Sequence, residues 1–278
     1  MDALFCDTEL AERIERAEAA FMAACAEAGK ARGADPRGFT LPVGGGMATF
    51  VEAGSPFNKV SGLGFGGVPD LDDVELAFAG VGCPVQVELS TLGDAAVGAH
   101  LTERGYRLAG FENVLGRRLT DVPAYPAEVR RSPDGELRAW LDVVVEAFLH
   151  EDVEGVTSHE EFSREALEAA ERDQATSAGA VRYLAWRDGV PVGGGALRVT
   201  GDGIAQFAGA ATLPEHRRRG VQSALLAARL ADARAAGCDL AVVTTRPGSP
   251  SQSNVQRAGF QLLYSRAIVT HSTSQRPF

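Results

Sequence analysis

Cysteine is scarce in this chain, and its spacing does not suit a metal. The four cysteines, Cys6, Cys25, Cys83 and Cys238, are irregularly spread, with no C-x-x-C pair and no histidine at ligand spacing beside them. We therefore expect neither a structural metal nor a disulfide framework.

Long apolar runs are also missing, and the first residues do not have the pattern of a secretory signal. No stretch approaches the roughly 18 consecutive apolar residues that a membrane helix needs. The first residues, MDALFCDTELAERIERAEAA, have no basic segment followed by an apolar core. We expect no membrane association, no secretory signal and a cytoplasmic location.

The chain has no excess of positive charge. It carries 27 Lys and Arg against 37 Asp and Glu, for a net charge of −10. Nucleic acid would repel such a protein on average, so we expect no nucleic-acid partner. The run Arg217-Arg218-Arg219 in "PEHRRRGVQSALL" (214–226) then needs a local explanation.

A length of 278 residues suggests two domains. "GYRLAGFENVLGRRL" (105–119) resembles "GFQLLYSRAIVTHS" (259–272) at an offset of 154 residues, and each follows a helix and continues as strands. The segment between the copies, "TDVPAYPAEVR", has two prolines and no periodicity, as a linker should. We expect domains at 1–122 and 132–278, joined by a linker at 123–131.

The elements expected in the second half alternate between helix and strand. Apolar spacing predicts helices over 134–149 and after residue 158, and "DG" and "GDG" turns separate three antiparallel strands up to Thr212. A helix closed by Gly237 then leads to a buried strand at 239–245. We expect an α/β fold in which each domain has a mixed, mainly antiparallel sheet flanked by helices, and we expect another amphipathic helix over 8–28.

The arginine run stands where an anion would bind. A strand ends at Pro214, and a helix begins after Gly220. The first amides of a helix lack intrahelical acceptors, and the helix dipole adds about half a positive charge there. Glycine lets a ligand approach the backbone closely, so a pyrophosphate suits this point.

These residues and this order of elements resemble the GNAT superfamily of acyl-CoA N-acyltransferases over residues of about 132–270. The family signature, R/Q-x-x-G-x-G/A, matches the six residues from Arg217 to Gln222, between the family-like "TLPEH" and "SALL". Gln222 departs from the usual Gly or Ala, which bears on cofactor affinity.

The resemblance implies acetyl-CoA as co-substrate and no metal. It implies that the backbone of Ala210 and Thr212 pairs with pantetheine, and that amides in the turn hold the pyrophosphate. The full set of expected cofactor residues is Ala210, Thr212, Arg217, Arg218, Arg219, Gly220, Val221, Gln222, Ser223 and Asn254.

The family's usual general acid, a tyrosine, aligns with Val255. Ser251, Asn254 and Tyr264 remain as candidates to protonate the thiolate, beside water, although each also suits a cap, a cofactor contact or a core position. The candidate for the general base is Glu151, in the acidic segment "LHEDVEG" (149–155), although this segment could equally be a solvated loop. Gln206 stands where some family members carry a glutamate base, but its side chain cannot take a proton.

The N-terminal half resembles a degenerate GNAT copy. It contains no R-x-x-G-x-G/A, and Asp70, Asp72 and Asp73 stand where phosphate would lie. We expect this half to bind no CoA, and either to complete the acceptor cleft or to mimic a dimer partner.

The sequence therefore predicts transfer of an acetyl group from acetyl-CoA to the amine of a small molecule, by direct attack in a ternary complex. A non-catalytic acyl-CoA sensor is the alternative, and a nucleotide-binding module is disfavoured by charge. The acceptor stays open, and both a monomer and a homodimer are compatible with the sequence.

Overall fold

A computed structural model describes residues 3–150, 156 and 161–272. The chain forms two compact units. The N-terminal unit comprises Phe5–Glu112, Ser158–Ala166 and Tyr264–Phe278, and the C-terminal unit comprises Met1–Leu4, Asn113–Thr157 and Leu167–Leu263. No helix in the described part of the chain is long and apolar enough to cross a membrane.

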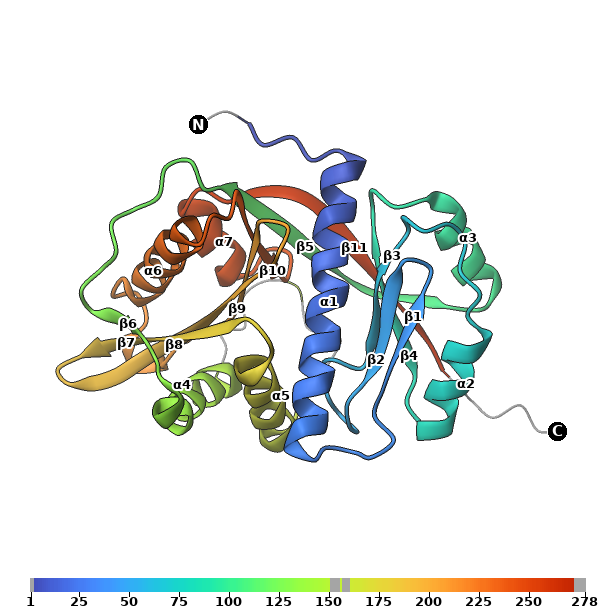
Figure 1. The fold of residues 1–278 in the computed structure, drawn as a ribbon, viewed down its shortest axis with the longest axis horizontal. Coiled ribbons are helices and arrows are strands. Elements are labelled where there is room, and N and C mark those ends of the chain that lie inside the picture. The colour runs from blue at the N-terminus through green and yellow to red at the C-terminus, as the bar shows by residue number, and fades with distance from the viewer. Residues whose placement is uncertain (1–2, 151–155, 157–160, 273–278) are drawn as a thin grey trace. The chain divides into compact units, whose positions relative to one another are not determined.

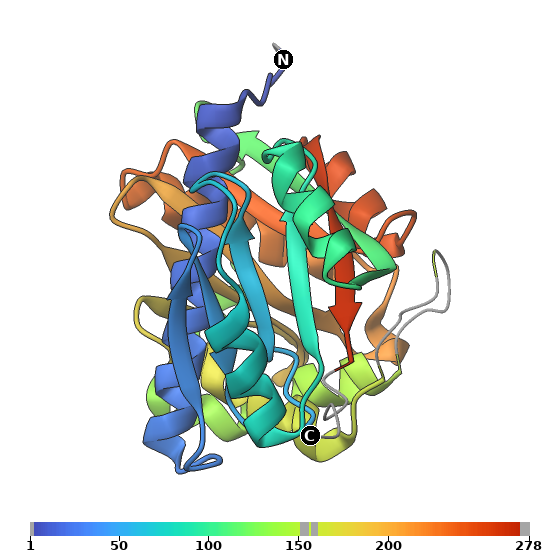
Figure 2. The same cartoon turned by 90° about the vertical axis from the view of Figure 1, so that its right-hand side faces the viewer.

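The N-terminal unit is a sheet with helices on both faces. Its strands have the order β1-β2-β3-β4-β11, and only β3 and β4 are parallel. Helix α1 covers one face, and α2 and α3 cover the other (Figures 1 and 2). The elements are α1 (Thr8–Arg32), β1 (Phe39–Val43), β2 (Gly46–Phe50), β3 (Lys59–Leu63), α2 (Asp72–Val81), β4 (Val85–Ser90), α3 (Ala95–Glu103) and β11 (Gln261–His271).

Helix α1 forms because its ends are capped and one face is apolar. The carboxylate of Asp7 accepts a hydrogen bond from the Leu10 amide at 2.9 Å, and Gly33 ends the helix at a φ of 87°. Ile14, Phe21 and other apolar residues of one face are buried. The helix predicted over 8–28 is present and runs one turn further.

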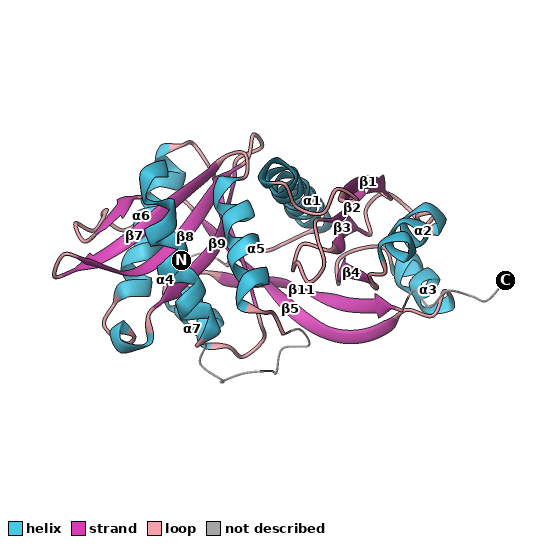
Figure 3. Ribbon diagram, turned by 90° about the horizontal axis from the view of Figure 1, so that it is seen from below, coloured by secondary structure: helices cyan, strands magenta, loops and turns pink. Residues whose placement is uncertain are grey.

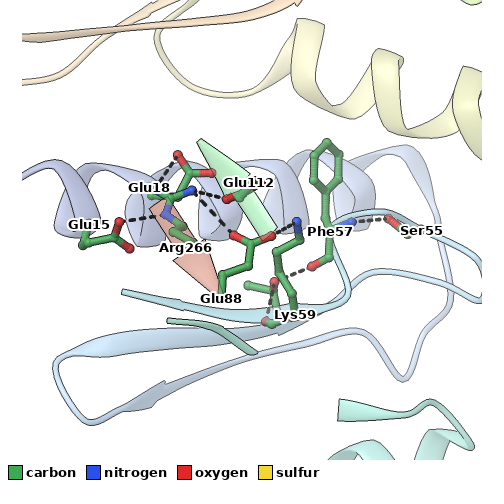
Figure 4. Close-up of polar contacts among 9 residues, drawn as sticks. Glu15, Glu18, Ser55, Phe57, Lys59, Glu88, Glu112 and Arg266 are labelled. Carbon is green, nitrogen blue, oxygen red and sulfur yellow. Dashed lines mark hydrogen bonds and ion pairs between the residues drawn. The ribbon is translucent and has the colours of Figure 1, made fainter. Parts of the chain in front are cut away.

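A charged cluster lies buried in this unit. Arg266 of β11 and Glu15 of α1 are each 1% exposed, and the Arg266 Nε lies 2.7 Å from the Glu15 Oε1 (Figure 4). The same guanidinium lies 2.7 Å from Glu112, 3.7 Å from Glu88 and 3.9 Å from Glu18. Burial raises the pKa of Glu112 to about 7.

Two further contacts extend the cluster. Glu88 also pairs with Lys59, and the hydroxyl of Tyr264 donates a hydrogen bond to Glu15 Oε1 at 2.6 Å. The cluster therefore fastens β11 to α1, to β4 and to β5 (Arg107–Arg118) within this unit.

The C-terminal unit has the strand order β5-β10-β9-β8-β7-β6, and only β9 and β10 are parallel. Helices α4 and α5 pack on one face, and α6 and α7 on the other (Figure 3). The elements are β5 (Arg107–Arg118), β6 (Val129–Arg131), α4 (Leu137–Leu149), α5 (Arg164–Thr176), β7 (Ala180–Arg187), β8 (Val190–Val199), β9 (Ile204–Thr212), α6 (Val221–Ala235), β10 (Leu240–Thr245) and α7 (Pro250–Arg257).

Two strands pass from one unit to the other. β5 begins in the N-terminal unit, and its residues 113–118 pair with β10; β11 begins in the C-terminal unit, and its residues 266–271 pair with β4. These strands are the two copies of the repeat predicted at an offset of 154 residues. Each one completes a sheet composed otherwise of the other half of the sequence.

The compact units consequently differ from the expected division at 123–131. Residues 113–118 lie in the C-terminal unit and residues 264–271 in the N-terminal unit, because each segment pairs with a strand of that unit. The last three residues of the expected linker, Val129–Arg131, form strand β6 and pair with β7.

Candidate functional site

The arginine-rich turn presents the open N-terminus of α6. A short 3-10 helix, Pro214–His216, follows β9, and Arg218 and Gly220 then take positive φ values of 59° and 82°. Gly220 offers no side chain to cap the helix. The first amides of α6, at Val221–Ser223, therefore have no acceptor within the helix and form a site suited to an anion.

Consecutive glycines in β8 bring α6 close to the sheet. A Cβ on Gly193 would lie 2.6 Å from Cγ1 of Val221, the first residue of α6. On the other face, a Cβ on Gly194 would lie 2.5 Å from Cγ2 of Val144 in α4. Side chains at these two positions would push both helices off the strand, so the glycines set the position of the α6 N-terminus.

Strands β9 and β10 part at the site. Their parallel pairing ends with Phe207 opposite Val243, although β9 continues to Thr212 and β10 to Thr245. On its other edge, β9 has an irregularity against β8, where Gly209 takes a φ of 56°. The diverging strands leave room for an extended ligand beside β9.

A cavity of about 890 Å³ occupies this opening. Its described lining includes five arginines and one histidine, but no aspartate or glutamate; they are Arg217, Arg218, Arg229, Arg246, Arg257 and His216. In a chain of net charge −10, this concentration of positive charge indicates an anionic ligand.

Several polar atoms on the cavity wall lack a protein partner. Thr212 Oγ1, Thr245 Oγ1 and His216 Nδ1 are buried without a hydrogen bond in the described structure. Buried polar groups are normally paired, so these atoms indicate that the ligand is polar as well as anionic.

The three arginines of the motif do not act alike. The Arg217 guanidinium donates to the carbonyl oxygens of Thr212 (3.2 Å), Ala147 (3.1 Å) and His150 (2.6 Å), which ties the end of β9 to the last turn of α4. Arg218 lines the cavity and is exposed. Arg219 is not among the lining residues, and its carbonyl oxygen accepts a hydrogen bond from Arg187.

Most of the expected cofactor residues line this one cavity. They are Ala210, Thr212, Arg217, Arg218, Gly220, Val221, Gln222, Ser223 and Asn254. Arg219 is the exception.

Helix α7 brings polar candidates to the same cavity. Ser249 caps the helix, and both Ser251 and Asn254 line the cavity. The side-chain Oδ1 of Asn254 accepts a hydrogen bond from the Arg257 guanidinium. Val255 also contributes to the wall but is 5% exposed and packs in the core of this unit.

The structure separates Tyr264 from these residues. Tyr264 belongs to the N-terminal unit, where burial and the bond to Glu15 raise its pKa well above the usual value. It does not line the described cavity, so its expected role as an acid there is not supported. Glu151 lies outside the described residues, whereas Gln206 is buried and accepts a hydrogen bond from Arg198 at 2.7 Å.

Glu171 of α5 was not among the residues predicted from the sequence. An added Cβ on Gly209 would lie 3.0 Å from Glu171 Oε2, so this carboxylate adjoins the cavity wall. Burial raises the pKa of Glu171 to about 8. In the sequence, Glu171 is one of five glutamates between residues 160 and 171, and no local signal distinguishes it.

Carboxylates surround the corresponding helix start in the N-terminal unit. Asp72, Asp73 and Glu75 occupy the first turn of α2, and Asp70 accepts a hydrogen bond from the Asp72 amide at 3.0 Å. Arg104 pairs with Asp72 and Glu75. This helix start is therefore electrostatically unsuited to a phosphate.

Residues 142–260 match the model of the acetyltransferase (GNAT) family. This segment is similar to GNAT domains. A GCN5-related N-acetyltransferase from Kribbella flavida has a similar structure, with 20% identity over 84% of this chain and 89% of that protein, and a TM-score of 0.59. A tandem GNAT protein from the clavulanic acid biosynthesis pathway has 15% identity over 91% of this chain and 89% of its own, and a TM-score of 0.58. No curated protein matches the sequence.

The resemblance to the GNAT superfamily and the predicted fold class are confirmed. Both solved structures share the fold across most of this chain, and one of them is described as tandem. The GNAT match indicates acyl transfer from acyl-CoA as the chemistry of the C-terminal half. Within the described residues, no group of three or more His, Cys, Asp or Glu side chains is placed to hold a metal.

Proposed function

We propose that the GNAT domain binds acetyl-CoA in the arginine-lined cavity and transfers its acetyl group to the amine of a small molecule. The observation that carries this proposal is the lining itself: five arginines, no carboxylate among the described residues, and an open helix N-terminus. A phosphorylated ligand satisfies all three.

Each part of the cofactor has a suitable partner. The amides of Val221–Ser223 hold the pyrophosphate, and Arg218 lies on the wall beside them. The pantetheine arm runs along β9 where that strand has left β10, and bonds to the backbone of Ala210 and Thr212 as an added strand would. Thr212 Oγ1 and Thr245 Oγ1 are available for its amides.

Transfer proceeds by direct attack, so no covalent enzyme intermediate is needed. The neutral amine adds to the thioester carbonyl, the C–S bond breaks, and the thiolate of CoA leaves. No tyrosine lines the described cavity, so Ser251, Asn254 or water supplies the proton to the thiolate. Holding the two reactants together contributes the larger part of the rate.

Calorimetric titration with acetyl-CoA tests the site. Gly220→Asp places a carboxylate at the N-terminus of α6, whereas Gly237→Asp places one after its C-terminus. The two glycines form a matched pair, because each has a φ of 82° and open space around an added Cβ. We expect one site per chain, weakened by Gly220→Asp about tenfold or more, which is about 1.4 kcal/mol, and little changed by Gly237→Asp.

Release of free thiol from acetyl-CoA, measured with a panel of primary amines, then tests transfer. Turnover that is lost in Gly220→Asp and kept in Gly237→Asp supports the proposal. Tight binding with no turnover of any amine would favour a non-catalytic acyl-CoA sensor, and absence of binding to the wild type would remove the cofactor site altogether.

A further inference from the structure

Helix α5 brings a carboxylate against the cavity wall at Gly209. Gly209 lines the cavity at the irregularity in β9. A Cβ at this position would lie 2.5 Å from Gln174 Nε2, 3.0 Å from Glu171 Oε2 and 3.3 Å from Trp140 Cη2. Because Gly209 has no side chain, the Glu171 carboxylate lies close to the backbone of β9 at the cavity wall.

Glu171 is short of partners for a carboxylate at such a position. Its Oε2 accepts a hydrogen bond from Gln174 Nε2 at 3.1 Å, and no arginine, lysine or histidine of the described structure pairs with it. Glu168 of the same helix, by contrast, pairs with Arg138 at 2.8 Å. A half-buried carboxylate without a cation favours binding of a positively charged group.

The position also suits the reaction. The stretch of β9 from Thr212 back to Gly209 spans about 10 Å at about 3.3 Å per residue. A pantetheine arm that starts at the α6 N-terminus and follows this stretch brings its thioester toward Gly209. An amine that attacks this thioester then comes close to Glu171.

We propose that Glu171 binds the ammonium group of the acceptor and removes its proton, as the general base of the transfer. This inference rests on the acyl-transfer function proposed above. One N–H proton passes to Glu171 Oε2 and leaves the nitrogen lone pair free to attack the carbonyl carbon. As the C–S bond breaks, the second proton goes to the departing thiolate, and Glu171 later returns its proton to water.

The ionisation of Glu171 fits this role. Burial raises its pKa to about 8, which lies between the usual value for glutamate and the value of about 10.4 for an alkyl ammonium group such as that of lysine. A base works best when its pKa lies near the working pH. Gln174, which is 7% exposed, fixes the direction of the carboxylate through its amide.

The test compares Glu171→Gln with Glu165→Gln. Glu165 lies exposed in the first turn of the same helix, so its substitution removes one negative charge away from the cavity. The acceptor is the primary amine that the wild type acetylates fastest. We expect Glu171→Gln to leave the Kd of acetyl-CoA within about twofold and to lower kcat/KM for the amine by about 10²- to 10⁴-fold, with Glu165→Gln unchanged in both.

The pH profile separates a base from a merely structural residue. For the wild type, kcat/KM should rise up to an inflection near pH 8 with any acceptor. In Glu171→Gln the inflection should instead follow the acceptor's own pKa, because only amine that is already neutral in solution reacts. An equal loss at every pH, with the inflection near pH 8 retained, would overturn the role of Glu171.

The outcomes also separate this inference from the proposed function. If the wild type turns over an amine and Glu171→Gln has normal activity, Glu171 is not the general base, but the acyltransferase function still holds. No turnover of any amine by the wild type would remove both.

Discussion

The buried Arg266 cluster predicts a large and pH-dependent contribution to stability. Arg266→Met keeps a long apolar side chain but removes the guanidinium that lies 2.7 Å from both Glu15 and Glu112. Removing one member of a buried ion pair usually costs about 3–5 kcal/mol, because the remaining charge stays buried without compensation.

The pH dependence can be worked out from the carboxyl groups. A buried carboxylate that loses its cation takes up a proton in the folded state. From an unfolded pKa of about 4.3, this costs about 3.7 kcal/mol at pH 7 and about 1.6 kcal/mol at pH 5.5, at about 1.36 kcal/mol per unit. The folded variant then binds more protons than the unfolded chain, so its stability falls as pH rises.

We therefore expect Arg266→Met to lose about 4 kcal/mol at pH 7 and about half of that at pH 5.5. Urea unfolding followed by far-UV circular dichroism measures the free energy at both pH values. Arg104→Met is the matched control: Arg104 also pairs with two carboxylates of the N-terminal unit but is 26% exposed, so its loss should stay below about 1 kcal/mol. Equal losses in the two variants, or a loss in Arg266→Met that does not change with pH, would refute this reasoning.

Two further substitutions probe the same reading of the structure. Tyr264→Phe removes the 2.6 Å hydrogen bond to Glu15, so the free energy of unfolding in urea should fall by about 1–3 kcal/mol. Turnover of acetyl-CoA should not change. A large drop in kcat with unchanged stability would instead support Tyr264 as the general acid. Gly209→Ala adds a Cβ 2.5 Å from Gln174 Nε2, at a φ of 56°. Because Gln174 holds Glu171, the added atom should displace this carboxylate and lower kcat/KM by about 100-fold while acetyl-CoA still binds. Full activity with an intact fold would contradict the position assigned to Glu171.

The cofactor side of the site could be predicted from the sequence because its signal is local. A strand end, Pro214, a basic turn, Gly220 and the start of a helix follow one another within a dozen residues, and the structure places nearly all of them on one cavity. The meander of β7, β8 and β9 was predictable for the same reason, since Asp188-Gly189 and Gly201-Asp202-Gly203 mark its turns.

The catalytic side could not be predicted in this way. Glu171 reaches the cavity wall only because α5 packs against β9 where Gly209 has no side chain. Tyr264 is only a few residues from Val255 in the sequence, yet the strand that carries it crosses into the other unit. In both cases the deciding contact joins residues far apart along the chain, and neither spacing nor composition encodes it.

Because β5 and β11 each pass from one unit to the other, the two halves of the sequence depend on each other to complete their sheets. Neither unit is encoded by one uninterrupted stretch of the gene, because each contains a strand from the other half of the sequence. If either half of the sequence were lost, the sheet of the remaining half would have an unpaired edge strand, and such an edge is a template for aggregation. The C-terminal sheet therefore depends on β5, a strand that the N-terminal half of the sequence supplies.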